Sequence, residues 1–211
     1  MHILAIGAHH DDIELGCGGS LARFARGGDA VSGIVLTDSA TEYPRHGIRR
    51  TADEARAEAR AAAREIGYTL IETAAAPARN GELAYTVPLM REVEAFIDAR
   101  QVGMVFCHWP HDVNTDHAAA SRIALTAARR VPRVLLYRSN RYAAGVPFNP
   151  AHFIDISATI EFKRRALACF TVEVRNRGAA WAEAFVQECA LHGAAIGCAQ
   201  AEAFEAVRFL V

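Results

Sequence analysis

The stretch H-I-L-A-I-G, residues 2–7, is followed directly by A-H-H-D-D-I-E-L-G-C-G-G, residues 8–19. The first part is a short apolar run that ends at Gly7, which predicts a buried β-strand over 2–6. The second part crowds histidines and carboxylates together and ends in a glycine-rich stretch, 16–19, that we interpret as a turn. The chain therefore leaves a core strand and at once presents a group of polar, metal-ligating side chains.

A second cluster of the same kind stands about half the chain length further on. Residues 108–117 read H-W-P-H-D-V-N-T-D-H and follow an apolar run over 102–107. Such groups are costly to crowd together unless their charge is compensated, and imidazole nitrogens and carboxylate oxygens are common ligands of divalent metals. Open α/β sheets bind ligands at the carboxyl ends of their strands. We therefore expect the two clusters to share one metal site with an acid–base group beside it.

The rest of the chain alternates apolar runs with helix-forming segments. This order predicts an α/β fold, a Rossmann-like, mostly parallel sheet flanked by helices. The glycine-rich turn is expected to lead into a helix that begins at Ser20 and ends before Gly27, and residues 38–47 are expected to form a polar loop. Further strands are predicted at 31–37, 68–72, 102–107, 133–137, 153–156 and 207–211, and further helices at 51–65, 87–99, 117–130, 156–169 and 181–201.

Size and composition fit one substantial domain, which we expect to span residues 1–211. The chain is 52% hydrophobic with a formal net charge of −1, so it lacks the basic surplus of nucleic-acid-binding proteins. The sequence shows no signal-peptide pattern before the first strand and no apolar run long enough to cross a bilayer. Its five cysteines form no C-x-x-C pair, which is typical of reduced thiols. We expect a cytoplasmic protein without nucleic-acid or membrane partners. The sequence leaves open whether the protein forms a homo-oligomer.

The paired motifs A-H-x-D-D-x-E-L-G-x-G-G and P-x-D-x-x-x-D-H resemble the LmbE/PIG-L family of metal-dependent deacetylases. Those enzymes remove the acetyl group from N-acetylglucosamine conjugates and related N-acyl compounds. The resemblance implies that His9, Asp12 and His117 bind zinc and leave a fourth position open, as in catalytic zinc sites. A His/His/Asp set also suits other divalent ions. Asp11 matches the family's general base, which takes a proton from water and passes it to the leaving amine; a cap of the following turn is the alternative for this residue.

The sequence departs from the family pattern at two positions. His10 stands where the family usually has a proline, and we expect this change to alter only the stiffness of the turn. Asn114 stands where many members have a histidine that stabilises the tetrahedral oxyanion. An asparagine amide can still donate a hydrogen bond to a developing negative charge, but it cannot act as a protonated acid. We therefore assign Asn114 to the oxyanion, and Asp116 to the orientation of His117 or Asn114.

Four further residues are predicted to contact the substrate: Asp38, Arg50, His111 and Asp112. Asp38 follows the predicted strand 31–37 and therefore faces the same edge of the sheet. Arg50 precedes a long helix, near where sugar deacetylases of this family place an arginine; a solvated basic turn is the alternative. His111 and Asp112 belong to the second cluster. For His111, as for His108, the alternative is a solvated position in the loop.

These assignments predict a zinc-dependent hydrolase that removes an acetyl group from an N-acetylated amino sugar or a sugar-containing small molecule. Two other functions stay open. One is an amidase acting on a thiol conjugate or a non-sugar N-acyl metabolite. The other is a sugar-binding relative that has lost turnover because of Asn114. Specificity in such folds depends on loops, here expected at 39–48, 74–85 and 139–150, so the sequence does not name the substrate.

Overall fold

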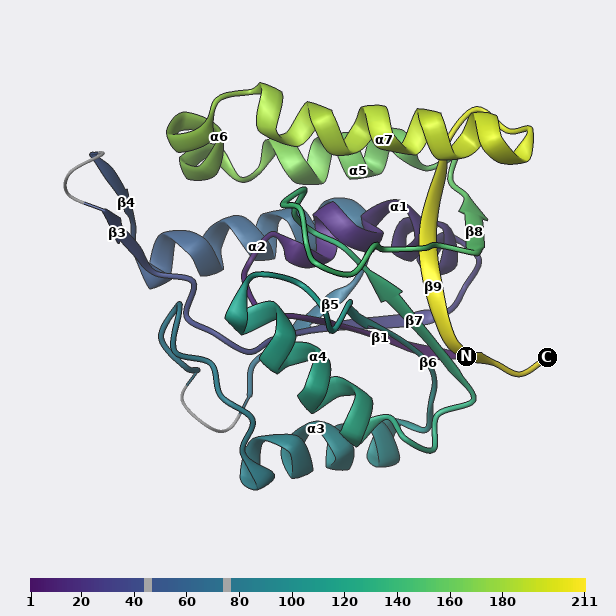
Figure 1. The fold of residues 1–211 in the computed structure, drawn as a ribbon, viewed down its shortest axis with the longest axis horizontal. Helices are drawn as coiled ribbons and strands as arrows, with labels where there is room; N and C mark the ends of the chain where they lie inside the picture. The colour runs from purple at the N-terminus through teal and green to yellow at the C-terminus, as the bar shows by residue number, and fades with distance from the viewer. Residues whose placement is uncertain (44–46, 74–76) are drawn as a thin grey trace.

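The protein, seen in a computed structural model that describes residues 1–43, 47–73 and 77–211, folds around a central sheet with helices on both faces (Figure 1). Positions 44–46 and 74–76 of the expected loops lie outside the described residues. Five strands run parallel in the order β5–β2–β1–β6–β7, with bounds β1 His2–Gly7, β2 Ala30–Val35, β5 Thr69–Ile71, β6 Val102–His108 and β7 Arg133–Tyr137. Two antiparallel strands, β9 (Ala201–Phe209) and β8 (His152–Asp155), complete the sheet. The predicted mostly parallel α/β sheet is confirmed.

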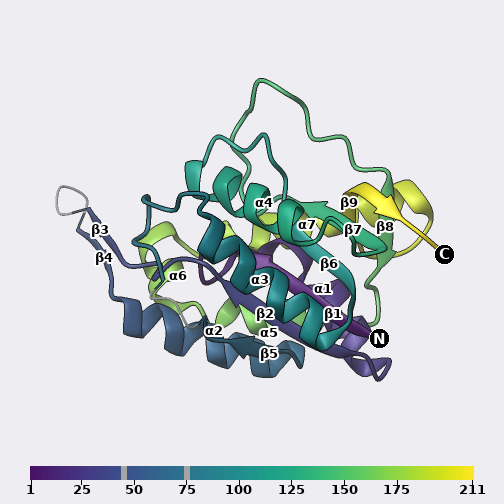
Figure 2. The same cartoon turned by 90° about the horizontal axis from the view of Figure 1, so that it is seen from below.

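Helices cover both faces of the sheet (Figures 1 and 2). The residues of β1 show the division, because successive side chains of a strand point to opposite faces. Ile3 and Ala5 belong to one core cluster, and Leu4 and Ile6 belong to the other. The first cluster is covered by α1 (Asp12–Arg26), α2 (Ala52–Ile66), α5 (Ile160–Ala168) and α7 (Ala180–Ile196), and the second by α3 (Val87–Arg100) and α4 (Thr115–Ala127).

Helix α2 begins and ends at the expected signals. Thr51 and Glu54 form a capping box, in which Thr51 Oγ1 accepts a hydrogen bond from Glu54 N at 3.2 Å and Glu54 Oε2 accepts one from Thr51 N at 2.8 Å. Gly67 closes the helix in the left-handed conformation, at φ 95°.

The glycine-rich stretch 16–19 is not a turn, contrary to the prediction. It lies inside α1, which begins at Asp12 rather than at Ser20. Tertiary packing overrides the low helix propensity of glycine here. A Cβ atom on Gly16 would lie 2.1 Å from Cδ2 of Tyr137, and one on Gly19 would lie 2.6 Å from Cδ1 of Ile156. The glycines let the buried helix approach its neighbours closely, which brings the start of α1 over the end of β1.

The last third of the chain also differs from the prediction. The helix expected over 181–201 ends at Ile196, the strand expected at 207–211 begins at Ala201, and α6 (Thr171–Arg177) was not predicted. A buried ion pair explains the early start of β9: Lys163 Nζ donates to Glu202 Oε1 at 2.6 Å and to the Leu15 carbonyl at 2.7 Å. Glu202 also accepts the backbone N–H groups of residues 19 and 20, so it ties β9 to the middle of α1.

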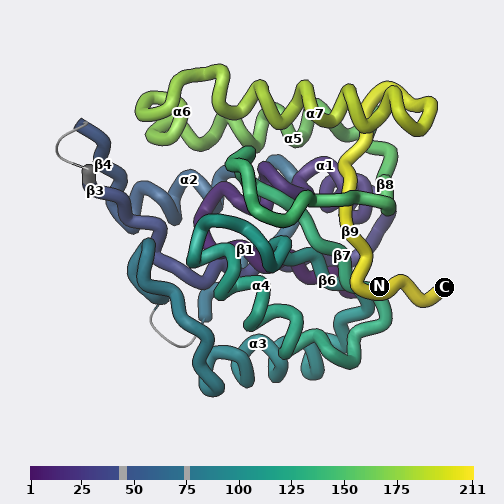
Figure 3. Tube along the Cα trace, in the orientation of Figure 1, coloured from purple at the N-terminus to yellow at the C-terminus, as the bar shows by residue number. Residues whose placement is uncertain are grey.

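The polar loop expected over 38–47 contains one strand of a small hairpin, β3 (Thr41–Tyr43), which pairs with β4 (Ile48–Arg50). This hairpin projects from one end of the molecule, and both chain ends lie at the opposite end (Figure 3). In the described part of the chain, no helix has both the length and the apolar character needed to cross a membrane.

Replacing Gly16 by alanine should destabilise the protein. Alanine favours helix by about 1 kcal/mol over glycine, but overpacking costs typically about 1–3 kcal/mol, and Tyr137 cannot easily retreat because its hydroxyl donates to the Ile6 carbonyl at 2.8 Å. We expect a lower midpoint of chemical unfolding. The control is Gly145→Ala, at an exposed glycine with nothing within 4 Å of the added Cβ. A Gly16→Ala protein as stable as the control would contradict this account of α1.

Candidate active site

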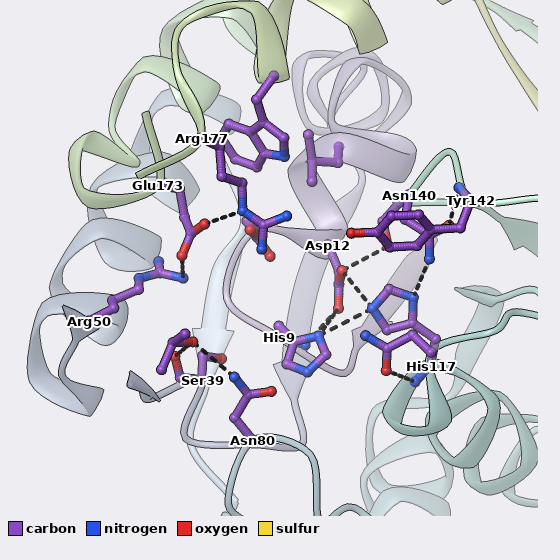
Figure 4. A pocket seen from close by; sticks show the side chains of 16 residues that line it. His9, Asp12, Ser39, Arg50, Asn80, His117, Asn140, Tyr142, Glu173 and Arg177 are labelled. Atoms are coloured by element: carbon purple, nitrogen blue, oxygen red, sulfur yellow. Dashed lines mark hydrogen bonds and ion pairs between the residues drawn. The ribbon is translucent and has the colours of Figure 1, made fainter. Parts of the chain in front are cut away.

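The carboxyl ends of β1 and β6 bring the two clusters together, and three of their side chains converge. His9 lies in the loop after β1, Asp12 begins α1, and His117 lies in the first turn of α4. His9 Nδ1 is 3.2 Å from His117 Nε2, and each of these nitrogens is 3.3 Å from an oxygen of Asp12. Figure 4 shows the three side chains turned toward one another. Their ligand atoms all lie within 4.8 Å of one another, so the group could hold a metal ion.

The chemistry of this donor set fits a divalent metal. The far nitrogen of each imidazole is held by a carboxylate: His9 Nε2 is 3.0 Å from Asp116 Oδ2, and His117 Nδ1 is 2.9 Å from Asp112 Oδ2. Metal-binding histidines are typically held in this way, because the carboxylate fixes the tautomer and aims the other nitrogen at the metal. Two imidazole lone pairs and one carboxylate then face a common point, which favours a cation there.

The electrostatics of the cluster also call for positive charge. Burial lowers the pKa of His9, but the carboxylates of Asp12 and Asp116 raise it to about 10. Burial also lowers the pKa of His117, but the carboxylates of Asp12 and Asp112 raise it to about 9. Burial opposes ionisation of Asp12, yet the surrounding imidazoles hold its pKa well below the ordinary value. The carboxylates therefore need a cation beside them, which protons on the imidazoles or a metal ion can supply.

Asp12 is held in place by groups from three strand ends. Its Oδ1 accepts a hydrogen bond from Ser139 Oγ at 2.7 Å, and its Oδ2 accepts one from the His9 backbone N–H at 2.6 Å. His108 is fully buried behind the ligands, with Nε2 3.1 Å from Asp12 Oδ2 and its ring stacked on His117 at 4.2 Å. Sequence reasoning missed Ser139, although a polar residue just beyond the strand 133–137 is the signal that could have found it.

Asp11 faces a cavity of about 190 Å³ beside the convergent side chains. It occupies the N-cap position of α1, but its carboxylate makes no capping hydrogen bond. The capping alternative therefore does not account for it. Burial and the neighbouring Asp12 raise the pKa of Asp11 to about 6, against the opposing charge of Arg50. The described lining residues are His9, Asp11, Asp12, Leu15, Ser39, Thr41, Arg50, Asn80, Asn114, His117, Ser139, Asn140, Tyr142, Glu173, Arg177 and Trp181.

Asn114 also lines this cavity and caps α4. Its Oδ1 accepts hydrogen bonds from the backbone N–H groups of Asp116 at 2.9 Å and His117 at 3.4 Å. The cap uses the amide oxygen, so the Nδ2 group, which has no hydrogen-bond partner among the described residues, remains available as a donor. Asp116 orients His9, not His117 or Asn114 as predicted, and its carboxylate also accepts two backbone N–H groups, from Gly81 and Leu83.

Three of the four residues predicted to contact the substrate are not among the described lining residues of this cavity: Asp38, His111 and Asp112. Asp112 holds His117 and accepts hydrogen bonds from Asn140 Nδ2 at 2.7 Å, because the second cluster wraps around the start of α4 and turns this carboxylate inward. Asp38 accepts backbone N–H groups of residues 40 and 80 and lines a neighbouring cavity instead. His111 is exposed and packs on Trp109. Arg50 lies in the cavity wall, but it is buried and bound to Glu58 and Glu173.

The wall opposite the second cluster comes from α6 and α7, which sequence reasoning did not place at the site. Glu173, Arg177 and Trp181 line the cavity there. They stand far from both motifs in the sequence, and no local pattern marks them. The packing of α5 on α1 and α2, and of α6 on β4 and α7, brings them to the sheet edge.

Residues 4–128 match the family described as PIG-L, GlcNAc-PI de-N-acetylase. The protein belongs to the PIG-L family. It is 30% identical over 142 residues to the uncharacterized deacetylase YaiS of Escherichia coli K12, a match that covers 65% of this chain and 73% of that protein. The family supports hydrolase activity of the deacetylase type for this chain.

Two solved structures illustrate how widely the fold is shared. The N,N'-diacetylchitobiose deacetylase of Pyrococcus horikoshii aligns with a TM-score of 0.78 at 19% identity, over 98% of this chain and 83% of that one. The 4-carboxy-2-hydroxymuconate hydratase GalB of Pseudomonas putida KT2440 aligns equally well, with a TM-score of 0.78 at 20% identity, over 100% and 97% of the two chains. At these identities the likeness concerns the fold alone, so the reaction has to be argued from the residues of the site.

Replacing His117 by alanine removes one of the three convergent ligand atoms, so metal retention should fall sharply. The measurement is metal content per chain after dialysis against metal-free buffer, read by elemental analysis. His111→Ala is the matched control, because it removes an exposed imidazole from the same loop. Equal metal content in the two variants would contradict the assignment of His117 as a ligand.

Proposed function

We propose that the protein is a zinc-dependent hydrolase that removes the acetyl group from an N-acetylated amino sugar or a sugar-containing small molecule. One observation carries this proposal. A His9–Asp12–His117 group suited to a metal lines the same cavity as the carboxylate of Asp11, which makes no capping hydrogen bond to α1. A metal site with a free acid–base group beside it is the usual requirement of metal-assisted amide hydrolysis. Sugar substrates are favoured by the family description and by the chitobiose deacetylase among the structural relatives.

His9, Asp12 and His117 would hold the divalent metal, which would supply Lewis-acid chemistry for water and an acyl carbonyl. The residues of the chain perform the proton transfers. Asp11 accepts a proton from the attacking water and later delivers it to the nitrogen of the leaving amine. Asp112 and Asp116 hold the two imidazoles in fixed tautomers throughout, so Asp11 is the carboxylate at this centre that remains free to exchange a proton.

Asn114 supplies the oxyanion donor in this proposal. Its amide oxygen is occupied by the α4 cap, so the Nδ2 group is the end that a substrate meets. A preorganised donor of this kind stabilises the negative charge that develops on the acyl oxygen in the transition state. The five cysteines are all free in the structure, which agrees with the cytoplasmic location that we also propose.

The direct test is acetate release from a panel of neutral and anionic N-acetylated sugars, with an acylated thiol conjugate as the alternative substrate. Protein stripped by a chelator should be inactive, and added zinc should restore turnover; manganese, iron and nickel test the identity of the metal. Hydrolysis of the thiol conjugate alone would favour the amidase alternative. Absence of any hydrolysis by metal-loaded protein would favour the sugar-binding relative.

Asp11→Asn should retain metal and lose activity. The amide is nearly isosteric with the carboxylate, so the site keeps its shape while the proton acceptor is lost. General acid–base groups contribute typically about 10²–10⁴-fold to rate, and we expect kcat to fall within that range while metal content stays equal to wild type. Turnover within a few-fold of wild type would exclude Asp11 as the base.

Variants of Asn114 separate its two roles. Asn114→Ala removes the donor and the cap, and the lost cap alone should cost about 1 kcal/mol of stability. Asn114→Asp retains a capping oxygen but puts a carboxylate against the developing charge. Both should lower kcat, by about 10²-fold for one lost donor, with little change in KM, and the aspartate variant should be the slower of the two although it is the more stable.

Asn114→His restores the commoner family residue and should keep or raise turnover. If the natural protein is inactive and this variant gains activity, the protein is a binding relative rather than an enzyme. A fully active Asn114→Ala would assign oxyanion stabilisation to another group.

A further inference from the structure

Two arginines lie in the cavity wall, and a buried glutamate joins them. Arg50 comes from the end of β4 and Arg177 from the end of α6. Glu173 Oε1 accepts from Arg50 Nη1 at 3.4 Å, and Glu173 Oε2 accepts from Arg177 Nε at 2.5 Å. Figure 4 shows this Arg50–Glu173–Arg177 chain, with the guanidinium of Arg177 directed from α6 into the cavity.

Both terminal amino groups of Arg50 are engaged within the protein. Arg50 Nη2 donates to the His10 carbonyl and to Glu58 Oε2, each at 3.0 Å, and its side chain is only 2% exposed. Its Nε is enclosed without a partner among the described residues. Two buried carboxylates, Glu58 and Glu173, balance its charge. Arg50 therefore supports the wall, and little of its guanidinium can reach a ligand.

Arg177, in contrast to Arg50, is accessible to a ligand. Its side chain is 51% exposed, and only its Nε is bound. Neither terminal amino group has a hydrogen-bond partner among the described residues. The Glu173 contact and the ring of Trp181, 5.7 Å from its guanidinium carbon, limit the orientations of the group. Burial lowers its pKa, but the carboxylates of Glu173 and Asp11 raise it above the ordinary value, so the group is charged at any working pH.

The part of this network that a ligand can reach is therefore the planar guanidinium of Arg177. The carboxylates behind it are enclosed, with side-chain exposures of 10% for Glu58 and 5% for Glu173, and their oxygens are all bound. A planar fork with two free amino groups matches the paired oxygens of a carboxylate or phosphate, and it binds them more strongly than it binds neutral oxygens.

We propose that Arg177 binds an anionic substituent, a carboxylate or a phosphate, on the N-acetylated substrate, and so sets a preference for acidic amino sugars over neutral ones. This inference rests on the proposed function, since it assigns the substrate class of the same cavity. Arg177 acts in recognition and not in proton transfer. Its loss should therefore affect anionic substrates more than neutral ones.

The experiment compares four proteins: wild type, Arg177→Gln, Arg177→Lys and Arg175→Gln. Arg175 is the matched control, because it is an exposed arginine on the same helix that is not among the cavity-lining residues described. The substrates are N-acetylglucosamine, its 1-phosphate and 6-phosphate, and N-acetylmuramic acid, which carries a carboxylate. Acetate release gives kcat/KM for each pair of protein and substrate.

Wild type should prefer at least one anionic substrate over the neutral sugar. Arg177→Gln should lower kcat/KM for that substrate on the order of 10- to 100-fold, the value of a hydrogen bond to a charged group, and should change kcat/KM for the neutral sugar by less, so that the preference for the anionic substrate is lost. Arg177→Lys should retain part of the preference, and Arg175→Gln all of it. The preferred substrate distinguishes phosphate from carboxylate recognition.

Two results would overturn the proposal: a wild-type protein with no preference for any anionic substrate, or an Arg177→Gln protein that keeps the preference. If no substrate is hydrolysed, the proposed function fails, and a binding measurement then tests the role of Arg177 separately. Calorimetric titration of the metal-loaded proteins with glucosamine, glucosamine 6-phosphate and muramic acid then supports the proposal only if Arg177→Gln selectively weakens an anionic ligand. Equal binding by both proteins overturns it.

Discussion

The buried carboxylate of Asp12 imposes the main constraint on this structure. An ionised group this deep in a protein is tolerated only when hydrogen bonds and opposite charge compensate it. Ser139 and the His9 backbone N–H supply the hydrogen bonds. The imidazoles face it from the loop after β1, the end of β6 and the first turn of α4. These groups come from the ends of β1, β6 and β7, so the parallel sheet has to align those ends for the carboxylate to be satisfied.

The same constraint explains the glycines of α1. The helix begins at Asp12, so its first turns must pack directly on the strands that carry the other site residues. Gly16 admits the ring of Tyr137, and Tyr137 lies 4.8 Å from the ring of His108, which in turn stacks on His117. A chain of packed rings therefore links the glycine face of the helix to a candidate metal ligand. Helix propensity is sacrificed at these positions because close approach sets the geometry of the site.

The sequence was sufficient to predict what depends on local pattern. Apolar runs predicted the parallel strands, and the position of both clusters after such runs predicted that the clusters would share one site. The resemblance to the family implied that His9, Asp12 and His117 would meet there. It failed where long-range contacts decide. The glycines of 16–19 have the composition of a turn, and only the partners across the core make them helical. The start of β9 at Ala201 depends on the Lys163–Glu202 ion pair, whose members stand 39 residues apart. Which carboxylate holds which imidazole depends on side-chain directions that spacing does not encode.

The two halves of the cavity differ in how they are built, and this difference bears on how such a site can change its substrate. The catalytic half is tied to the sheet: Asp12, Asp112 and Asp116 each join a ligand imidazole to another part of the chain, so a substitution there disturbs several contacts at once. In the half formed by α6 and α7, Glu173 joins Arg50 to Arg177, and the Arg177 side chain is 51% exposed and bound only through its Nε. Substitutions at positions such as 177 and 181 can therefore alter recognition while the ligand geometry stays intact. A shared fold that includes both a deacetylase and a hydratase agrees with that separation, because the sheet edge supplies a rigid frame and the surrounding helices and loops supply the chemistry that selects a substrate.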